Sequence, residues 1–487
     1  MKSLQEILIN VTLSRVSGSL DLELTGITLD SRLVKPGFAF IAVYGTQTNG
    51  HDYIEKAIEN GASAIIFEAN GTETDQRVSW IKVQDSAESL GIIAGNWFGN
   101  PSRQLSLIAI TGTNGKTTTA TLLYQLFQNL GYQVGLLSTV ENKIGEETIE
   151  STYTTPDAIS LNELLAKMLR SGCSHVFMEA SSHAIHQRRV AGLDFNGAVF
   201  SNISHDHLDY HGTFDNYIAA KKLLFDGLSP KAFCLVNVDD KRGKVMIQNT
   251  AAKIQTYSLQ TGANFRGKVL SNTLEGLHME INGKEVWFKL VGDFNAYNLV
   301  AVFGVAMLLG ENEDEVLLAL SSLNPVRGRF ERILLKNGAV SIIDYAHTPD
   351  ALKNVLETIK SMQIPGENLI TVVGCGGNRD KAKRPVMAEV ASRLSTQVFL
   401  TSDNPRNEEP KTIIQEMMDG VPLSQRRKVA IIEEREAAIR EAIAMAKIND
   451  VVLVAGKGHE TYQEIQGVKY PFDDRAKVLA TQNPILN

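Results

Sequence analysis

The sequence predicts an α/β protein built from three domains, and three observations support this fold class. The chain has 487 residues, a length that suggests about three domains. Apolar residues make up 43% and charged residues 21% of the chain, as is typical of globular domains with a buried core. Short apolar runs alternate with segments of helical periodicity, which is the pattern of parallel sheets with helices on both faces.

Residues 1–98 are expected to form a small N-terminal α/β domain. Its strands are predicted at FAFIAV (residues 38–43) and ASAIIF (62–67), which are rich in β-forming residues. The segment DYIEKAIENGA (52–62) between them has the spacing of a helix.

Residues 99–330 are expected to form a central domain with a parallel sheet. The apolar strand SLIAIT (106–111) is followed by a glycine-rich turn and by a helix that ends at Gly131. Further apolar runs alternate with helices, namely HVFMEA, GAVFSN and AFCLVN. We expect the polar residues that follow each run to meet at one edge of the sheet.

Residues 331–487 repeat the alternation and predict a Rossmann-like, doubly wound C-terminal domain. The predicted strands are VSIIDY, LITVVGCG, QVFLTSD and VVLVAGKG. Each ends in small or polar residues, where a crossover turn is expected to begin.

Composition and charge exclude several classes of protein. The formal net charge of -7 gives no overall attraction to nucleic acid or anionic membranes. The three cysteines, Cys173, Cys234 and Cys375, lack the spacing of a disulfide framework, so we expect reduced thiols in a cytoplasmic protein. The N-terminal MKSLQEILINVTL is interrupted by polar residues and is not expected to be a signal peptide. No uncharged apolar run approaches the roughly 18 residues of a membrane-spanning helix.

A glycine-rich turn, ITGTNGKTTTA (110–120), stands between a predicted strand and a predicted helix. Backbone N–H groups of such a turn, and of the helix N-terminus, can hold phosphate groups. Lys116 would reach the β- and γ-phosphates of a nucleotide, and the Thr117 hydroxyl would bind Mg²⁺. The usual motif has a glycine at the position of Ile110, so this chain has the shorter form GTNGKTT. A Gly-Lys-Thr turn alone could simply end a strand, but the strand, turn and helix in this order favour phosphate binding.

Acidic and histidine side chains gather after two later strands. Five of the ten histidines fall between His183 and His211. Their segments follow apolar strands, so they are expected at the carboxyl edge of the sheet, where α/β folds bind ligands. Glu179 is placed to hold a Mg²⁺ that bridges nucleotide phosphates, and His207 can join it.

The loop TSDNPRNEEP (401–410) allows two interpretations. Asn-Pro pairs start turns and Asp403 can accept local backbone hydrogen bonds, so the segment could be a turn and nothing more. Asp403, Asn404 and Arg406 around the rigid Pro405 could instead form a pocket for a ligand that carries both charges.

These motifs resemble those of the Mur ligase family of ATP-dependent amino-acid ligases. The resemblance covers nearly the whole chain, and the motifs stand in family order: GTNGKTT, MEASSH, HDHLDYHGTFDNYIAAK, GDFNAYN, GRF, DYAHTP, GCGGNRDKAKRP, SDNPR and GKGHETYQ. It implies a UDP-sugar-binding domain at 1–98, a P-loop ATP-binding domain at 99–330 and an amino-acid-binding domain at 331–487. The N-terminal LDSRLVKPGFAFIAVYGTQTNGHDY, with SDNPR and GKGHETYQ, is closest to family members that add the third residue of the peptidoglycan stem peptide.

The resemblance also implies the reaction and its residues. The substrates would be ATP, UDP-N-acetylmuramoyl-L-alanyl-D-glutamate and meso-2,6-diaminopimelate, with Mg²⁺ as cofactor. ATP would turn a carboxylate into an acyl phosphate, and an amine would then displace phosphate. The catalytic residues implied are Lys116, Glu179, His207 and Lys221. The metal ligands implied are Thr117, Glu179, His207 and Lys221, the last as a carbamate that turns a cation into an anion. Its neighbour Lys222 is expected on a solvated face.

Matching positions assign three sets of binding residues. Those for ATP are Gly112, Thr113, Asn114, Gly115, Lys116, Thr117, Thr118, Asn298, Arg329 and Asp344. Those for the UDP-sugar are Ser31, Thr46, Thr154, Thr155, Ser181, Gln187 and Arg189. Those for diaminopimelate are Arg379, Asp403, Asn404, Pro405, Arg406, Gly456 and Glu460.

Arg406 is expected to choose the diamino acid. The distal end of diaminopimelate is a zwitterion, so an Arg can pair with its carboxylate while Asp403 and Glu460 accept from its ammonium. Lysine lacks that carboxylate and would leave the arginine unpaired, a mismatch that can cost on the order of 10⁴ in selectivity.

Three alternatives stay open at this point. The chain could add L-lysine, or it could be a folylpolyglutamate synthetase, although DSR near the N-terminus and SDNPR fit the folate enzyme poorly. It could also be a catalytically silent nucleotide-binding regulator, but Lys116, Thr117, Glu179, His207 and Lys221 are all present. We expect small-molecule substrates, no nucleic acid partner, no membrane span and a monomer.

Overall fold

The computed structural model describes residues 1–46, 48–69, 75–149 and 154–481. They form two compact units, each made of three separate stretches of the chain. The first unit comprises Met1–Gly112, Thr119–Asn202 and Asp215–Thr256, and the second Thr113–Thr118, Ile203–Phe214 and Tyr257–Asn487. The predicted α/β class is confirmed, and the boundaries of the three predicted domains remain a prediction. No helix in the described ranges is long and apolar enough to cross a membrane.

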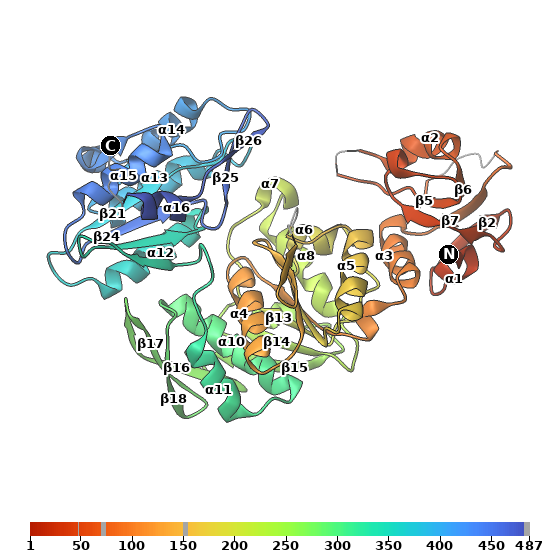
Figure 1. Cartoon of the computed structure of the whole chain (residues 1–487), viewed down its shortest axis with the longest axis horizontal. Helices are drawn as coiled ribbons and strands as arrows, with labels where there is room; N and C mark the ends of the chain where they lie inside the picture. The colour runs from red at the N-terminus through yellow and green to blue at the C-terminus, as the bar shows by residue number, and fades with distance from the viewer. Residues whose placement is uncertain (47, 70–74, 150–153, 482–487) are drawn as a thin grey trace. The chain divides into compact units, whose positions relative to one another are not determined.

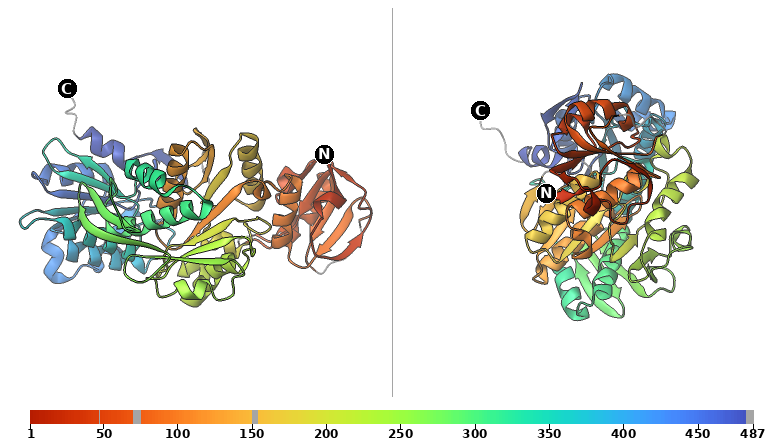
Figure 2. Two further views of the ribbon diagram at one scale, coloured as in Figure 1. Left: turned by 90° about the horizontal axis from the view of Figure 1, so that it is seen from below. Right: turned by 90° about the vertical axis from the view of Figure 1, so that its right-hand side faces the viewer.

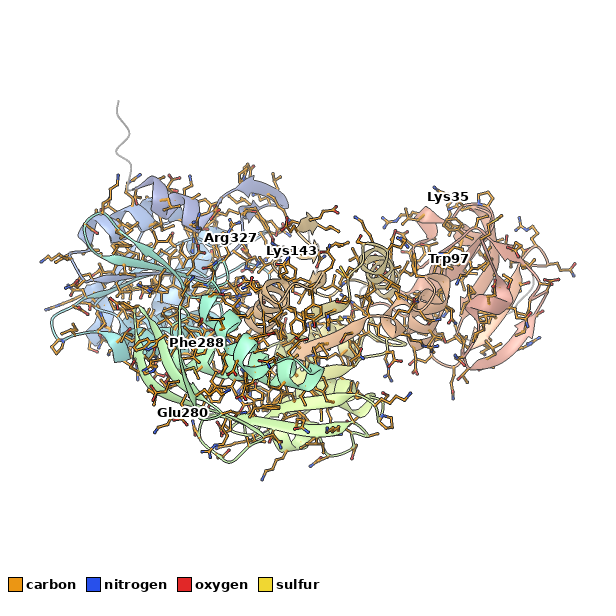
Figure 3. All side chains as sticks on the ribbon, turned by 60° about the horizontal axis from the view of Figure 1, so that its bottom comes forward. Lys35, Trp97, Lys143, Glu280, Phe288 and Arg327 are labelled. Carbon is orange, nitrogen blue, oxygen red and sulfur yellow. The ribbon has the colours of Figure 1, made fainter. Side chains whose placement is uncertain are left out.

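The first unit begins with a five-stranded sheet, drawn in red and orange in Figure 2. Its order is β2 (Leu13–Ser17), β7 (Ser79–Val83), β6 (Ala62–Phe67), β5 (Phe38–Ile41) and β4 (Gly26–Thr28). Helices α1 (Leu4–Ile7) and α3 (Ser86–Trp97, its last residue labelled in Figure 3) pack on one face, and α2 (Ile54–Glu59) packs on the other. Strands β1 (Lys2–Ser3) and β3 (Glu23–Leu24) pair beside α1. The strands predicted at residues 38–43 and 62–67 are confirmed as β5 and β6.

The larger sheet of the first unit is parallel at its centre. In spatial order these strands are β9 (Val134–Leu137), β12 (His175–Glu179), β8 (Ser106–Thr111), β13 (Gly197–Phe200), β14 (Phe233–Asn237) and β15 (Lys253–Ser258). An antiparallel hairpin of β10 (Asn142–Ile144) and β11 (Glu147–Ile149) extends the sheet beyond β9 and was not predicted from the sequence. The accompanying helices are α4 (Lys116–Asn129), α5 (Ala158–Arg170), α6 (Ser182–His186), α8 (Phe214–Asp226) and α9 (Gly243–Met246).

The second unit contains long antiparallel strands that were not predicted from the sequence. They are β16 (Phe265–Thr273), β17 (Gly276–Ile281) and β18 (Lys284–Phe288). Strand β16 also pairs in parallel with Tyr257 and Ser258 at the end of β15. Helix α10 (Asp293–Leu309) packs on β16, and α11 (Glu313–Ser322) packs on β18.

The rest of the second unit is a doubly wound sheet (Figure 1). Its order is β19 (Glu331–Leu334), β20 (Val340–Asp344), β24 (Val451–Ala455), β21 (Leu369–Val373), β22 (Gln397–Leu400) and β23 (Val429–Ile431), and only β19 is antiparallel. Helices α12 (Pro349–Met362), α13 (Lys383–Leu394) and α14 (Pro410–Asp419) cover one face. Helices α15 (Arg435–Met445) and α16 (Asp474–Ala480) cover the other. Neighbouring residues such as Ile342 and Ile343 point to opposite cores, as the period of a strand requires.

Strands β24, β21 and β22 are neighbours in this sheet, and a polar loop follows the carboxyl end of each. We name these loops the β21 loop (residues 374–382), the β22 loop (401–409) and the β24 loop (456–461). A hairpin of β25 (Tyr462–Ile465) and β26 (Val468–Pro471) follows the β24 loop. This edge is where open α/β sheets bind their ligands.

Candidate active site

The predicted strand, glycine turn and helix are present at residues 106–129, as β8 and α4. At Gly112 the backbone passes so close to β13 that an added Cβ would lie 1.9 Å from the Ser201 hydroxyl, so no larger residue fits there. Helix α4 begins at Lys116, whose ammonium donates to the Thr113 carbonyl at 2.9 Å. The Thr117 hydroxyl accepts from the Arg329 guanidinium at 3.1 Å. The turn thus presents backbone N–H groups and a cation at a helix N-terminus, an arrangement that suits phosphate.

Glu179 lies at the carboxyl end of β12 and is fully buried. Its carboxylate accepts from the backbone N–H of Thr139 at 2.7 Å and from the Thr139 hydroxyl at 3.2 Å. The Thr139 hydroxyl also lies 3.0 Å from the Thr154 hydroxyl, which can donate to it. The Thr155 hydroxyl donates to the Glu179 carbonyl at 2.8 Å. Two residues assigned to the UDP-sugar therefore lie beside a residue assigned to the metal.

Ser181, Gln187 and Arg189 lie on or beside the short helix α6, close to the same strand end. The Ser181 hydroxyl caps the helix by accepting from the Ala184 N–H at 3.2 Å. Arg189 donates to the Thr155 carbonyl at 3.0 Å and to the Gln187 side-chain oxygen at 2.6 Å. The remaining two residues assigned to the UDP-sugar belong to the N-terminal sheet region, where Ser31 is buried and Thr46 is exposed.

The adjacent lysines of α8 differ in their surroundings. Lys221 is 1% exposed, donates to the Gly112 carbonyl at 2.8 Å and lies over the Tyr217 ring. Lys222, expected on a solvated face, is instead only 13% exposed at its side chain and pairs with Asp226 one helical turn away. The sequence could not show this because the helix buries more of its circumference than an amphipathic surface helix does.

His207 and its neighbour Asp206 belong to the second unit. His207 has a left-handed backbone with φ of 54°, and its ring lies 3.6 Å from the Asp206 carboxylate. Burial acts to raise the pKa of Asp206, but the nearby His207, His347 and Lys116 outweigh it and lower that pKa. A negative charge thus persists within the electrostatic reach of the phosphate-loop lysine.

The three residues assigned to the nucleotide from later in the chain also lie in the second unit. Arg329 stacks over the Tyr345 ring, with 4.3 Å between its guanidinium carbon and the ring centre. Asp344 holds the backbone, because its carboxylate accepts from the N–H groups of Phe330 and Ala346 at 2.7 Å each. The Asn298 side chain on α10 donates to Asn295 at 3.0 Å.

The β22 loop and the β24 loop bring two carboxylates, those of Asp403 and Glu460, close together. Asp403 and Asn404 are both buried, and the Asn404 amide donates to the Glu460 carboxylate at 2.8 Å. Burial is the main cause that raises the pKa of Glu460, and the neighbouring Asp403 adds to it. Gly456 begins the β24 loop and donates its N–H to the Asp344 carbonyl. Turn chemistry is present as well, since Asp403 accepts from the Asn404 N–H at 2.7 Å.

Arg406 has protein partners of its own. Its guanidinium donates to the Gly377 carbonyl at 2.8 Å and lies 3.4 Å from the Glu464 carboxylate on β25. The backbone at Arg406 is left-handed, with φ of 52°, and pairs with β25. Arg379, on the β21 loop, is exposed. The expected cost of leaving Arg406 unpaired with lysine is therefore reduced, because Glu464 stays beside it.

Two further residues of this site were not named from the sequence. Lys457 is fully buried, and its ammonium donates to Asn404 at 3.1 Å and to Glu460 at 3.0 Å. Glu464 is the counter-ion of Arg406 just described. Lys457 stands inside the motif GKGHE, so its place beside Gly456 and Glu460 was the available signal, whereas nothing in the sequence singles out Glu464.

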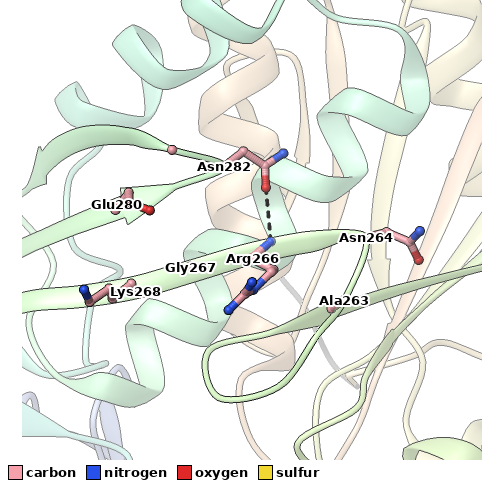
Figure 4. A pocket seen from close by; sticks show the side chains of 8 residues that line it. Ala263, Asn264, Arg266, Gly267, Lys268, Glu280 and Asn282 are labelled. Carbon is pink, nitrogen blue, oxygen red and sulfur yellow. Dashed lines mark hydrogen bonds between the residues drawn. The ribbon is translucent and has the colours of Figure 1, made fainter.

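A hollow of about 470 Å³ opens elsewhere in the second unit, on β16 and β17 (Figure 4). The backbone N–H of Arg266 donates to the Asn282 side chain at its wall, at 3.1 Å. Its lining residues are Ala263, Asn264, Arg266, Gly267, Lys268, Glu280, Asn282 and Gly283. None of the predicted site residues lines it.

Comparisons with known proteins identify the family of this chain. Three family models match in succession: a Mur ligase family catalytic domain at residues 23–97, a Mur ligase middle domain at 110–306, and a Mur ligase glutamate ligase domain at 328–458. This chain belongs to the Mur ligase family. Membership confirms the resemblance inferred from the ordered motifs, and it favours an enzyme over a silent regulator.

Individual Mur ligases match over nearly the full length. A protein of Cytophaga hutchinsonii named UDP-N-acetylmuramoyl-L-alanyl-D-glutamate--2,6-diaminopimelate ligase is 56% identical over 97% of each chain. One of the same name from Phocaeicola vulgatus is 51% identical over 97% of this chain and 98% of that protein. A solved structure of an enzyme of this name has a TM-score of 0.70 and 34% identity, covering 99% of this chain and 98% of the other.

Proposed function

We propose that this Mur ligase adds meso-2,6-diaminopimelate to UDP-N-acetylmuramoyl-L-alanyl-D-glutamate at the expense of ATP, a step in peptidoglycan precursor synthesis. The names of its relatives, at 51% and 56% identity over 97% of the chain, support this reaction over the addition of L-lysine. The observation that carries the choice of diamino acid is the set of opposite charges on the β22 and β24 loops.

These charges suit a zwitterion. Arg406 offers a planar fork of N–H donors to the distal carboxylate of the ligand, assisted by Arg379 on the neighbouring loop. Asp403 and Glu460 offer acceptors to the ammonium beside that carboxylate. Buried Lys457 donates to Glu460 and to Asn404, so it fixes the acceptor Glu460 on one side and balances part of its charge. L-lysine has the amine but no carboxylate to meet Arg406.

The chain's own residues support the two chemical steps by position and charge. The glutamyl carboxylate attacks the γ-phosphorus of ATP, the bond to ADP breaks, and an acyl phosphate forms. The amine of diaminopimelate then attacks the acyl carbon and loses a proton, and phosphate leaves. Lys116 and the N–H groups of Gly112–Thr118 are proposed to hold the phosphates, where negative charge develops in both steps. Asn298, Arg329 and Asp344 are proposed to place the nucleotide.

Mg²⁺, on which the family depends together with ATP, would neutralise phosphate charge when bound. The donor chemistry fits a hard cation, since Glu179 gives carboxylate oxygens at a strand end and Thr117 gives a hydroxyl oxygen. With His207 and Lys221 as a carbamate, these residues are proposed as its ligands.

The carbamate at Lys221 is part of the proposal. The Lys221 ammonium would first release one proton; the neutral amine would then attack CO₂, form an N–C bond and release a second proton, which leaves an anion in place of a cation. A buried anion at a site that is 1% exposed needs a cation beside it, which Mg²⁺ would supply when bound.

The UDP-sugar is assigned to Ser31, Thr46, Thr154, Thr155, Ser181, Gln187 and Arg189. Five of these lie together around the ends of β12 and α6, and their hydroxyls and guanidinium suit a diphosphate. A monomer in the cytoplasm is proposed, in keeping with small soluble substrates.

The reaction is tested by measuring ADP release with each substrate omitted in turn. We expect ADP release only when ATP, the UDP-linked dipeptide and meso-diaminopimelate are all present. ATP turnover without the other two substrates, or none with all three, would contradict the proposal. The Lys116→Met variant is the control for contaminating ATPases and is expected to lower the rate by on the order of 10³.

A further inference from the structure

The two arginines assigned to the distal carboxylate lie on different loops. Arg379 belongs to the β21 loop and Arg406 to the β22 loop, which follow neighbouring parallel strands. Recognition of one carboxylate by two groups requires that both loops keep a fixed separation. What holds the loops together therefore bears on selectivity.

The backbones of the two loops are in close contact. The Gly377 N–H donates to the Asn404 carbonyl at 2.9 Å, and the Asn407 N–H donates to the Asn378 side chain at 3.0 Å. An added Cβ at Gly377 would lie 1.9 Å from the Pro405 carbonyl oxygen, so only glycine permits this approach.

Beneath the loops lies a fully buried arginine, Arg384, in the first turn of α13. One of its terminal nitrogens donates to the Gly376 carbonyl at 3.3 Å and to the Glu408 carboxylate at 2.9 Å. The other donates to the second oxygen of Glu408 at 3.0 Å. A single guanidinium thus binds the β21 loop through a carbonyl and the β22 loop through a bidentate carboxylate.

Glu408 also connects the two loops directly. It belongs to the β22 loop, yet its carboxylate accepts from the backbone N–H of Asn378 in the β21 loop at 2.5 Å. Lys381 of the same loop lies 3.4 Å from it. Hydrogen bonds from Arg384 are the main cause that lowers the pKa of Glu408 to about 2, so the carboxylate is ionised at neutral pH.

We propose that Arg384 and Glu408 are positioning residues for the diamino acid, because together they lock the loops that carry Arg379 and Arg406. Neither residue is assigned to the ligand itself. The identity of the ligand rests on the proposed function, whereas the locking of the loops can be measured without it.

Glu416 offers a matched control. It lies on α14 and accepts from the same Arg384 guanidinium at 2.6 Å. Within the described parts of the chain it makes no hydrogen bond to the β21 or β22 loop. Removing Glu416 or Glu408 takes one carboxylate from Arg384, but only the loss of Glu408 also frees the loops.

The experiment compares Glu408→Ala, Glu416→Ala and the wild type in steady-state kinetics with meso-diaminopimelate and with L-lysine. For Glu408→Ala we expect KM for diaminopimelate to rise about tenfold and the preference over lysine to fall about as much. KM for ATP and for the UDP-linked dipeptide should stay within about twofold, because the loops do not hold them. Glu416→Ala should stay within about twofold in every constant, and Glu408→Gln, which keeps one oxygen, should lie in between.

Amide hydrogen exchange of the same proteins without ligand provides the second measurement. Exchange in residues 376–381 and 403–408 should accelerate in Glu408→Ala and not in Glu416→Ala. Equal exchange and equal KM in the two alanine variants would overturn the proposal. A wild type that shows no diaminopimelate-dependent ADP release would instead overturn the proposed function. The hydrogen-exchange result would still show whether Arg384 and Glu408 hold the β21 and β22 loops together.

Discussion

Arg406 has a counter-ion within the protein, Glu464. This ion pair affects what substitution of either residue is expected to do to the KM for the diamino acid. Glu464 lies 3.4 Å from the guanidinium, and the two side chains are 26% and 20% exposed. An ion pair with this exposure contributes little to stability, but in the proposed complex its carboxylate would compete with that of the ligand for the same arginine. Glu464 would then keep the arginine paired when the diamino acid offers no second carboxylate.

The Glu464→Gln variant tests this competition. We expect KM for meso-diaminopimelate to fall about threefold, because the ligand no longer displaces a resident carboxylate, while KM for L-lysine stays unchanged or rises. Gln463, whose amide donates to the Asp403 carbonyl, keeps β25 in place in both proteins. A KM for meso-diaminopimelate that rises in Glu464→Gln would contradict this competition. It would mean that Glu464 orients Arg406 for the ligand.

Lys221 provides a second prediction at this scale. If its carbamate supports the metal, Lys221→Ala should lower the rate by on the order of 10² or more, and added bicarbonate should not restore it. Carbon-13 NMR with labelled bicarbonate should show a carbamate signal in the wild type and none in the variant. A fully active Lys221→Ala enzyme would remove Lys221 from the mechanism.

At the scale of elements, the β21 and β22 loops with α13 form a unit whose stability depends on pH. The pKa of Glu408 falls from 4.5 to about 2 in the folded protein, chiefly through Arg384. A carboxylate with a lowered folded pKa stabilises the fold above its unfolded pKa and loses this contribution as the pH falls through the folded pKa.

The difference in free energy of unfolding between the wild type and Glu408→Ala should therefore be full above about pH 5 and shrink toward pH 2. Urea unfolding of both proteins from about pH 6 to about pH 3 measures this difference. A difference that stays constant over this range would show that the charge of Glu408 does not contribute.

Elements with strong apolar runs were predicted well from the sequence. Strands β8, β12 to β14, β20 to β22 and β24 stand where continuous apolar runs placed them. Antiparallel strands β10, β11 and β16 to β18 were missed, because none of them is one continuous apolar run; β16 and β17 instead alternate buried and more exposed residues. The burial of Lys222 was missed because α8 buries more of its circumference than an amphipathic surface helix does.

Across the whole molecule, contacts between residues that are far apart in the chain could not be predicted from the sequence. Arg384 meets Glu408 across 24 residues, and Lys457 meets Asn404 across 53, which requires the order of the strands in the sheet. The motifs gave the family and the residues of the phosphate loop, because these stand close together in the chain. The partners that hold Arg406 came only from the packed loops.

The central claim is that this Mur ligase selects meso-diaminopimelate through Arg406, and one comparison tests it most directly. The ratio of kcat/KM for meso-diaminopimelate to that for L-lysine should be measured in the wild type and in Arg406→Ala. We predict that the wild type prefers diaminopimelate and that the variant loses on the order of 10² of this preference, mainly through KM for diaminopimelate. An Arg406→Ala enzyme that keeps the full preference, or a wild type that prefers lysine, would contradict the account.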